Sequence, residues 1–150
     1  MQISEILSPN RILCDGNNSS KKSALESLSA LIASADPQIT QAEVFESLLA
    51  RERLGSTGLG EGIALPHGRL KSGERTIAAF LRTQNGIDYD AADRQPVDLL
   101  FALLVPENST EEHLQVLSKL AEMFSNEEFR QRLRTEDSSD AIYSLFAADV

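Results

Sequence analysis

The chain has 150 residues, of which 41% are hydrophobic and 25% charged, a composition typical of one globular domain and unlike that of a disordered or fibrous protein. Acidic residues number 23 against 14 basic ones, so the formal net charge is −9. Because phosphate contacts need an excess of Lys and Arg, this balance excludes a general nucleic-acid-binding protein.

The first forty residues predict one clear helix. Residues 3–13 are interpreted as a short lead-in that ends in turn residues at positions 15–18. From Ser20 onward, apolar residues recur at the spacing of one helix face. These positions are Ala24, Leu25, Leu28, Leu31 and Ile32.

A second helix is predicted from Thr40 to about Arg53. Thr40 and Glu43 have the spacing of a capping box, in which each side chain bonds the other residue's backbone N–H. Ile39 and Val44 occupy the two positions of a hydrophobic staple. Start signals of both kinds together make this the best-defined helix boundary in the sequence.

The middle of the chain predicts a glycine-rich passage followed by two strands. The glycines at 58, 60 and 62 follow a helix and precede an extended segment, whereas a dinucleotide-binding fingerprint needs the reverse order. We therefore interpret them as a tight backbone path. Ile77–Leu81 predicts a strand, and the almost wholly apolar Val97–Val105 predicts a strand covered on both faces and ended by Pro106.

The C-terminal third predicts three helices. Ser109 and Glu112 have capping-box spacing and open a helix with the apolar stripe His113, Leu117, Leu120 and Phe124. Shorter helices are expected around Phe129–Leu133 and Ala141–Phe146. Helices and strands alternate without repeats or a long linker, so the prediction is one α/β domain spanning residues 1–150.

The two histidines are the candidate chemical residues, and each has two interpretations. His67 lies between Pro66 and Gly68, which predicts a turn at a strand end that presents the ring to solvent, either as a functional group or as an incidental surface histidine. His113 falls on the apolar stripe in the first turn of its helix. It is either a core-edge histidine hydrogen-bonded to backbone or part of an anion site at the helix N-terminus.

A local excess of cations surrounds His67 in the sequence and either receives an anion or forms a solvated surface. It comprises Arg51, Arg53, Arg69, Lys71 and Arg75. The spacing of the histidines and of the lone Cys14 matches no common metal site, so we expect no metal and no cofactor.

The sequence predicts a soluble, cytoplasmic protein that does not insert into a membrane. Cys14 cannot form an internal disulfide and fits a reducing compartment. No charged-then-apolar leader opens the chain, and the longest strongly apolar run, Leu99–Val105, is too short to cross a bilayer.

Three segments together resemble one known family. They are residues 51–69, which include Gly-Ser-Thr-Gly-Leu-Gly-Glu-Gly and Leu-Pro-His67-Gly, residues 96–106, and residues 113–121. Over nearly the whole chain, the sequence resembles the fructose/mannitol-type enzyme IIA of the bacterial phosphoenolpyruvate-dependent phosphotransferase system, and most of all its nitrogen-regulatory branch. The resemblance implies a mixed β-sheet sandwiched between α-helices.

The resemblance also implies an activity and the residues that perform it. A histidine phosphocarrier protein would donate a phosphoryl group to His67, with His113 as the neighbouring active-site histidine and Arg51 as the phosphate-interacting arginine. Regulatory target proteins would then respond to the phosphorylation state. The 150 residues leave no room for attached IIB or IIC domains, and the expectation of the nitrogen-regulatory branch rests partly on this.

Two alternatives remain open at this point. One is a sugar-specific enzyme IIA that passes its phosphoryl group to an enzyme IIB. The other is a non-catalytic binding module in which His67 only contacts partner proteins.

Overall fold

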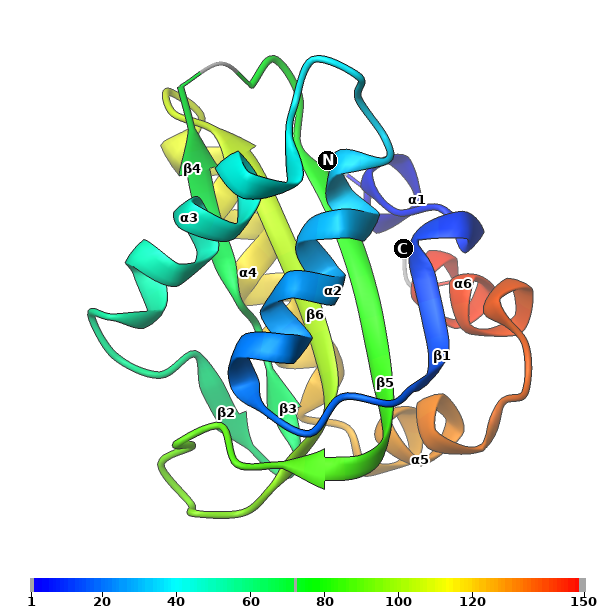
Figure 1. Cartoon of the computed structure of the whole chain (residues 1–150). Coiled ribbons are helices and arrows are strands. Elements are labelled where there is room, and N and C mark those ends of the chain that lie inside the picture. Colours follow the sequence, from blue (N-terminus) through cyan, green and yellow to red (C-terminus); the bar gives the residue numbers. More distant parts are fainter. Residues whose placement is uncertain (1, 72, 149–150) are drawn as a thin grey trace.

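The computed structural model describes residues 2–71 and 73–148 and contains one mixed sheet with helices on both faces (Figure 1). None of the helices in these residues is long and apolar enough to cross a membrane. The helices are α1 (Ile3–Ile6), the 3₁₀ turn η1 (Pro9–Arg11), α2 (Lys21–Ala33), α3 (Gln41–Glu52), α4 (Thr110–Phe124), α5 (Glu127–Thr135) and α6 (Ser139–Ala147). The strands are β1 (Ile12–Gly16), β2 (Gly58–Gly60), β3 (Ile63–Ala64), β4 (His67–Leu70), β5 (Ile77–Ile87) and β6 (Val97–Pro106).

The sheet is organised around β6. Its order is β1-β5-β6-β3-β2, and β4 also pairs with β6, further along the same strand. β6 is antiparallel to β5 and parallel to both β3 and β4. The expected mixed sheet between helix layers is confirmed.

Alternate side chains of β5 and β6 enter two separate cores. Phe80 and Phe101 pack with α1, α4 and α6 on one face, whereas Leu81 and Leu100 pack with α2 and α3 on the other. Residues Leu99 to Leu103 of β6 have no exposed surface. This confirms the prediction that the longest apolar run is a strand covered on both faces.

The predicted start of the second helix is also confirmed. The Thr40 hydroxyl accepts a hydrogen bond from Glu43 N at 3.1 Å, and the Glu43 carboxylate accepts one from Thr40 N at 3.2 Å. Ile39 and Val44 are both buried, as the hydrophobic staple requires. α3 ends at Glu52, with Arg53 as its C-cap.

One local prediction is wrong and two are incomplete. The lead-in holds α1, η1 and β1, which its sequence pattern did not indicate, and β1 pairs parallel with β5 at the sheet edge. Within the described residues, the Ser109 side chain makes no capping hydrogen bond, because its backbone at φ −100 and ψ 47 lies outside the extended region of most N-caps. The strand predicted at Ile77–Leu81 is confirmed, but it continues to Ile87 through a register irregularity after Arg82.

Candidate active site

Close packing between α3 and β4 forms the frame of the site. A Cβ added at Gly68 would lie 2.9 Å from the backbone carbonyl carbon and oxygen of Ser47, so only glycine lets the helix approach this closely. The Ser47 hydroxyl donates to the Arg69 carbonyl oxygen at 2.7 Å. Gly68 therefore acts in helix–strand packing rather than in the sharp turn expected from the sequence. The next turn of α3 brings Arg51 towards the start of β4.

His67 is the first residue of β4 and is half-buried. The expectation of a solvent-presenting turn is wrong, because His67 pairs with Leu103 of β6 as strand backbone. Its Nδ1 lies 2.8 Å from the Leu65 carbonyl oxygen. Since a carbonyl only accepts, this contact assigns the ring proton to Nδ1 and leaves the lone pair on Nε2.

The surroundings of His67 favour its neutral form. Burial lowers the pKa of His67 below its ordinary value of about 6.5. The Leu65 hydrogen bond raises this pKa, the positive charge of Arg51 lowers it, Glu52 raises it and Arg69 lowers it, with burial the largest effect. A neutral imidazole is the nucleophilic form at physiological pH.

His113 lies in the first turn of α4, beside His67. The centroids of the two rings are 5.0 Å apart in an edge-on arrangement with an interplanar angle of 69°. His113 is only 5% exposed, and neither of its ring nitrogens has a hydrogen-bond partner within the described chain. The interpretation as a backbone-bonded core histidine is therefore wrong. Burial, with smaller contributions from the charges of His67 and Arg69, lowers the pKa of His113 to about 4.

The cations that are clustered in the sequence separate in the fold. Arg51 and Arg69 line one hollow with the two histidines. Arg51 is in the last turn of α3, is half-buried and donates to the Gly55 carbonyl oxygen at 2.8 Å. Arg75 instead donates to the Ala35 carbonyl oxygen at 2.6 Å, and Arg53 does not line the hollow. The interpretation as an anion site thus applies to part of the cationic stretch only.

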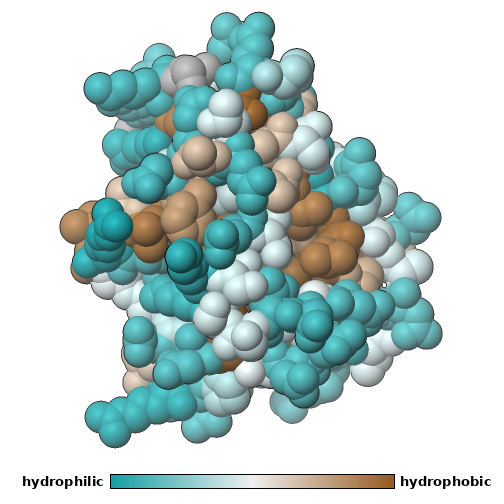
Figure 2. Space-filling model, in the orientation of Figure 1, coloured by the Kyte–Doolittle hydropathy of each residue, from teal (hydrophilic) through white to brown (hydrophobic). Residues whose placement is uncertain are grey.

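The hollow has a volume of about 480 Å³ and a mixed lining. Its apolar wall includes Leu54, which is 84% exposed, and Leu114, which is 61% exposed. Figure 2 shows apolar residues gathered over the end of α3, on the left of the view. Apolar side chains exposed around a polar site are typical of a surface that binds another protein. Within residues 2–71 and 73–148, no three His, Cys, Asp or Glu side chains are grouped to hold a metal ion.

Sequence reasoning missed two kinds of residue at this site. Leu114 lies off the apolar stripe of its helix, and an off-stripe leucine beside His113 is a signal that could have indicated the exposed wall. Ser47 and Glu52 carry no such signal, because Arg69 and Lys21, their respective partners, lie far away in sequence.

Residues 5–149 match the family model described as "Phosphoenolpyruvate-dependent sugar phosphotransferase system, EIIA 2". The nitrogen regulatory protein of Pseudomonas aeruginosa is 44% identical over 145 residues, which are 97% of this chain and 94% of that protein. The fructose-specific EIIA component of Haloferax volcanii is 35% identical over 127 residues, covering 85% of this chain and 82% of that one.

A solved structure has the same fold. The crystal structure of nitrogen regulatory protein IIA-Ntr from Neisseria meningitidis superposes with a TM-score of 0.91 at 45% identity, covering 96% of this chain and 98% of that chain. The sequence resemblance and the predicted α/β fold are therefore confirmed together.

Proposed function

Because this chain belongs to the EIIA 2 family of the phosphoenolpyruvate-dependent sugar phosphotransferase system, we propose that it accepts a phosphoryl group on His67 from a histidine phosphocarrier protein. It then binds regulatory partners according to its phosphorylation state. One arrangement supports this proposal most directly: the ring centroids of His67 and His113 lie 5.0 Å apart in a hollow that two arginines line, and the buried His113 has no hydrogen-bond partner among the described residues.

His67 acts as the nucleophile through Nε2. The bond from this nitrogen to phosphorus forms in line as the bond to the donor's imidazole nitrogen breaks, and that electron pair returns to the donor. The Nδ1 proton stays on its hydrogen bond to the Leu65 carbonyl, which holds the ring in one orientation. The lowered pKa of His67 keeps the lone pair available.

Three neighbouring side chains stabilise the transferring group. Arg51 has guanidinium N–H groups beyond the one bound to Gly55, and it grips the phosphoryl oxygens with them. His113 donates one ring N–H to a phosphoryl oxygen, so that a ring nitrogen without a partner among the described residues gains a hydrogen bond. The negative charge of the phosphoryl group then lies near the N-terminus of α4, where the helix dipole stabilises it. Arg69 adds positive charge at the same hollow.

The apolar wall of the hollow is the docking surface in this proposal. Leu54 and Leu114 contact the donor protein, and later the regulated partner, around the reacting histidine. Identities of 44% and 45% to nitrogen regulatory proteins, against 35% to a fructose-specific component, favour a regulatory role over sugar transport. The reaction belongs to the cytoplasm, where the phosphocarrier acts.

Incubation with phosphoenolpyruvate, enzyme I and the phosphocarrier tests the proposal. A phosphate-affinity gel run at alkaline pH should show a shifted band for wild type and none for His67→Ala, and the modification should be acid-labile and base-stable. No wild-type shift would favour a non-catalytic binding module. Transfer onward to a sugar-specific IIB would favour the transport branch, and a phosphopeptide with His113 but not His67 would contradict the site.

A further inference from the structure

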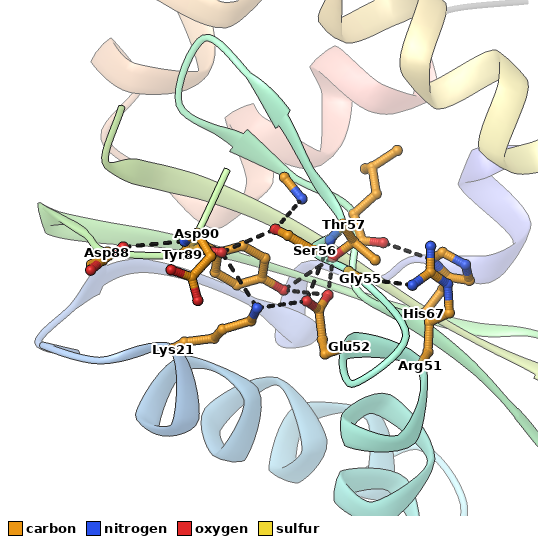
Figure 3. A network of polar contacts seen from close by, with 12 residues as sticks. Lys21, Arg51, Glu52, Gly55, Ser56, Thr57, His67, Asp88, Tyr89 and Asp90 are labelled. Carbon is orange, nitrogen blue, oxygen red and sulfur yellow. Dashed lines mark hydrogen bonds and ion pairs between the residues drawn. The ribbon is translucent and has the colours of Figure 1, made fainter. Parts of the chain in front are cut away.

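The residue after Arg51 is a buried carboxylate with an unusually complete set of donors (Figure 3). Glu52 is only 6% exposed. It accepts hydrogen bonds from Tyr89 OH at 2.9 Å, from Thr57 N at 3.3 Å and from the Thr57 hydroxyl, and it forms an ion pair with Lys21 Nζ at 2.8 Å. A buried carboxylate is costly unless it is paired and hydrogen-bonded, and here both conditions hold.

Glu52 joins three segments that are distant in sequence. Lys21 opens α2, Thr57 ends the loop after α3, and Tyr89 follows β5. Lys21 Nζ also lies 3.4 Å from the Tyr89 carbonyl oxygen and 4.4 Å from the centroid of the Tyr89 ring. The Ser56 hydroxyl donates to the same carbonyl at 3.0 Å. The loop after α3 is therefore held to the body of the protein mainly around this carboxylate.

The same loop orients Arg51. The Gly55 carbonyl oxygen that accepts from Arg51 Nη1 at 2.8 Å lies between Glu52 and Thr57, the two residues that the buried contacts hold together. Figure 3 shows the Arg51 and His67 side chains at the same end of this network, and both line the hollow. A movement of the loop would therefore displace the Gly55 carbonyl to which the guanidinium is bound.

We infer that Glu52 is a positioning residue for phosphoryl transfer, which holds Arg51 towards His67 through the loop 53–57. The inference rests on the function proposed above. A neutral amide at this position loses the ion pair with Lys21, and its NH₂ group faces other donors, so the loop and Arg51 lose their fixed geometry.

Rapid-quench transfer from the phosphorylated phosphocarrier to Glu52→Gln tests the inference. A misplacement of about 1 Å costs about 10²-fold in rate, so the maximal transfer rate should fall by up to that factor while the KM for the donor changes much less. Asp98→Asn is the matched control, because Asp98 is a carboxylate paired with Arg134 at 3.0 Å outside the hollow. It should lower stability without lowering the transfer rate.

A second variant and a second measurement keep the test decisive if Glu52→Gln folds poorly. Thr57→Val removes one hydroxyl contact from the carboxylate and should slow transfer in the same direction, by less. The pKa of His67, followed by NMR in the unphosphorylated protein, should rise in Glu52→Gln, because Arg51 lowers this pKa more strongly than Glu52 raises it and both effects are lost when Arg51 moves away. A fall in this pKa would show that only the negative charge of Glu52 was removed while Arg51 stayed in place, and would contradict the inference. The other charged or titratable groups around His67 are Arg51, Arg69 and His113.

The outcomes separate the two proposals. Wild-type protein that accepts no phosphoryl group would overturn the proposed function and this inference with it. A phosphorylated wild type, together with an unchanged maximal rate in folded Glu52→Gln or Thr57→Val, would overturn the inference alone. A rate loss equal to that of Asp98→Asn would also overturn it, because the effect would then follow general stability.

Discussion

At the scale of a single residue, a substitution of Arg51 distinguishes a catalytic role of this side chain from a structural one. A cation in the last turn of α3 is favourable to the helix dipole whatever its chemistry, and lysine keeps that benefit. Lysine lacks the planar fork of donors, however, so Arg51→Lys should slow phosphoryl transfer by about 10²–10³-fold, the usual cost of one transition-state donor. Stopped-flow transfer and a thermal melt, which should show an unchanged Tm, measure the two effects. A wild-type rate in the folded variant would instead assign the stabilising role to His113.

His113 predicts a pH dependence of stability. Its pKa is about 4 in the folded protein and about 6.5 when unfolded, so the unfolded chain binds more protons between these values. Stability should therefore be complete above pH 6.5 and fall as the pH drops towards 4, by up to about 3 kcal/mol for this residue. Below pH 4 both states are protonated and the contribution no longer changes.

Urea denaturation of wild type and His113→Gln across pH 4 to 7 separates the contribution of His113 to the unfolding free energy from that of carboxylates, which titrate in an overlapping pH range. The slope of unfolding free energy against pH should be shallower in the variant. Parallel slopes would show that His113 is protonated as easily in the folded protein as in the unfolded one.

Local sequence patterns identify the candidate histidines, whereas the expectation that the two are neighbours comes from the family resemblance alone. Pro-His67-Gly and the stripe position of His113 select both residues, and Arg51 follows from the family resemblance. The 5.0 Å ring contact, the Leu65 carbonyl on Nδ1 and the burial of His113 depend on packing between β4 and α4. No local pattern encodes a contact between residues 67 and 113.

At the scale of elements, the fit of α3 on β4 makes Gly68 critical. A Cβ added at Gly68 would lie 2.9 Å from the Ser47 backbone, so Gly68→Ala must push α3 away from β4. We expect a loss of about 1–3 kcal/mol in unfolding free energy, which is typical of overpacking, together with slower phosphoryl transfer as Arg51 moves with its helix.

Gly73→Ala is the matched control for this substitution. An added Cβ there would have its nearest neighbours at 3.4 to 3.8 Å, which is ordinary van der Waals contact. Equal stabilities of the two variants in urea would contradict the proposed packing constraint on Gly68.

Elements with strong local signals are predicted well, and those that depend on distant partners are not. The caps of α3 and the apolar run of β6 lie within the segments that they define. β1 has five residues, and it becomes a strand by pairing with β5, some seventy positions later. The Ser109–Glu112 spacing fits a capping box, but the loop after Pro106 gives Ser109 a backbone conformation that prevents it.

At the scale of the whole molecule, the proposed phosphorylation would add charge to an already acidic protein. The formal net charge is −9, and a phosphoryl group adds about −1.5 to −2 at one place. A partner that covers the hollow must desolvate or repel that charge, so its affinity should differ between the two forms. Titration of one regulatory partner with authentic phosphorylated and unphosphorylated protein measures the difference, with His67→Asp as a mimic. Equal affinities would contradict a charge-based switch.

The packing of α1 on α6 determines where the protein can be tethered without blocking the hollow around His67. The Tyr143 hydroxyl of α6 donates to the Ser4 carbonyl of α1 at 2.8 Å, and α6 also packs against the edge strand β1. β4, which carries His67, lies beyond β5 and β6 from that edge, and Figure 1 shows α1 and α6 on the opposite side from α3. A tether, tag or surface linkage near either described end of the chain therefore lies away from His67 and leaves the hollow around it accessible.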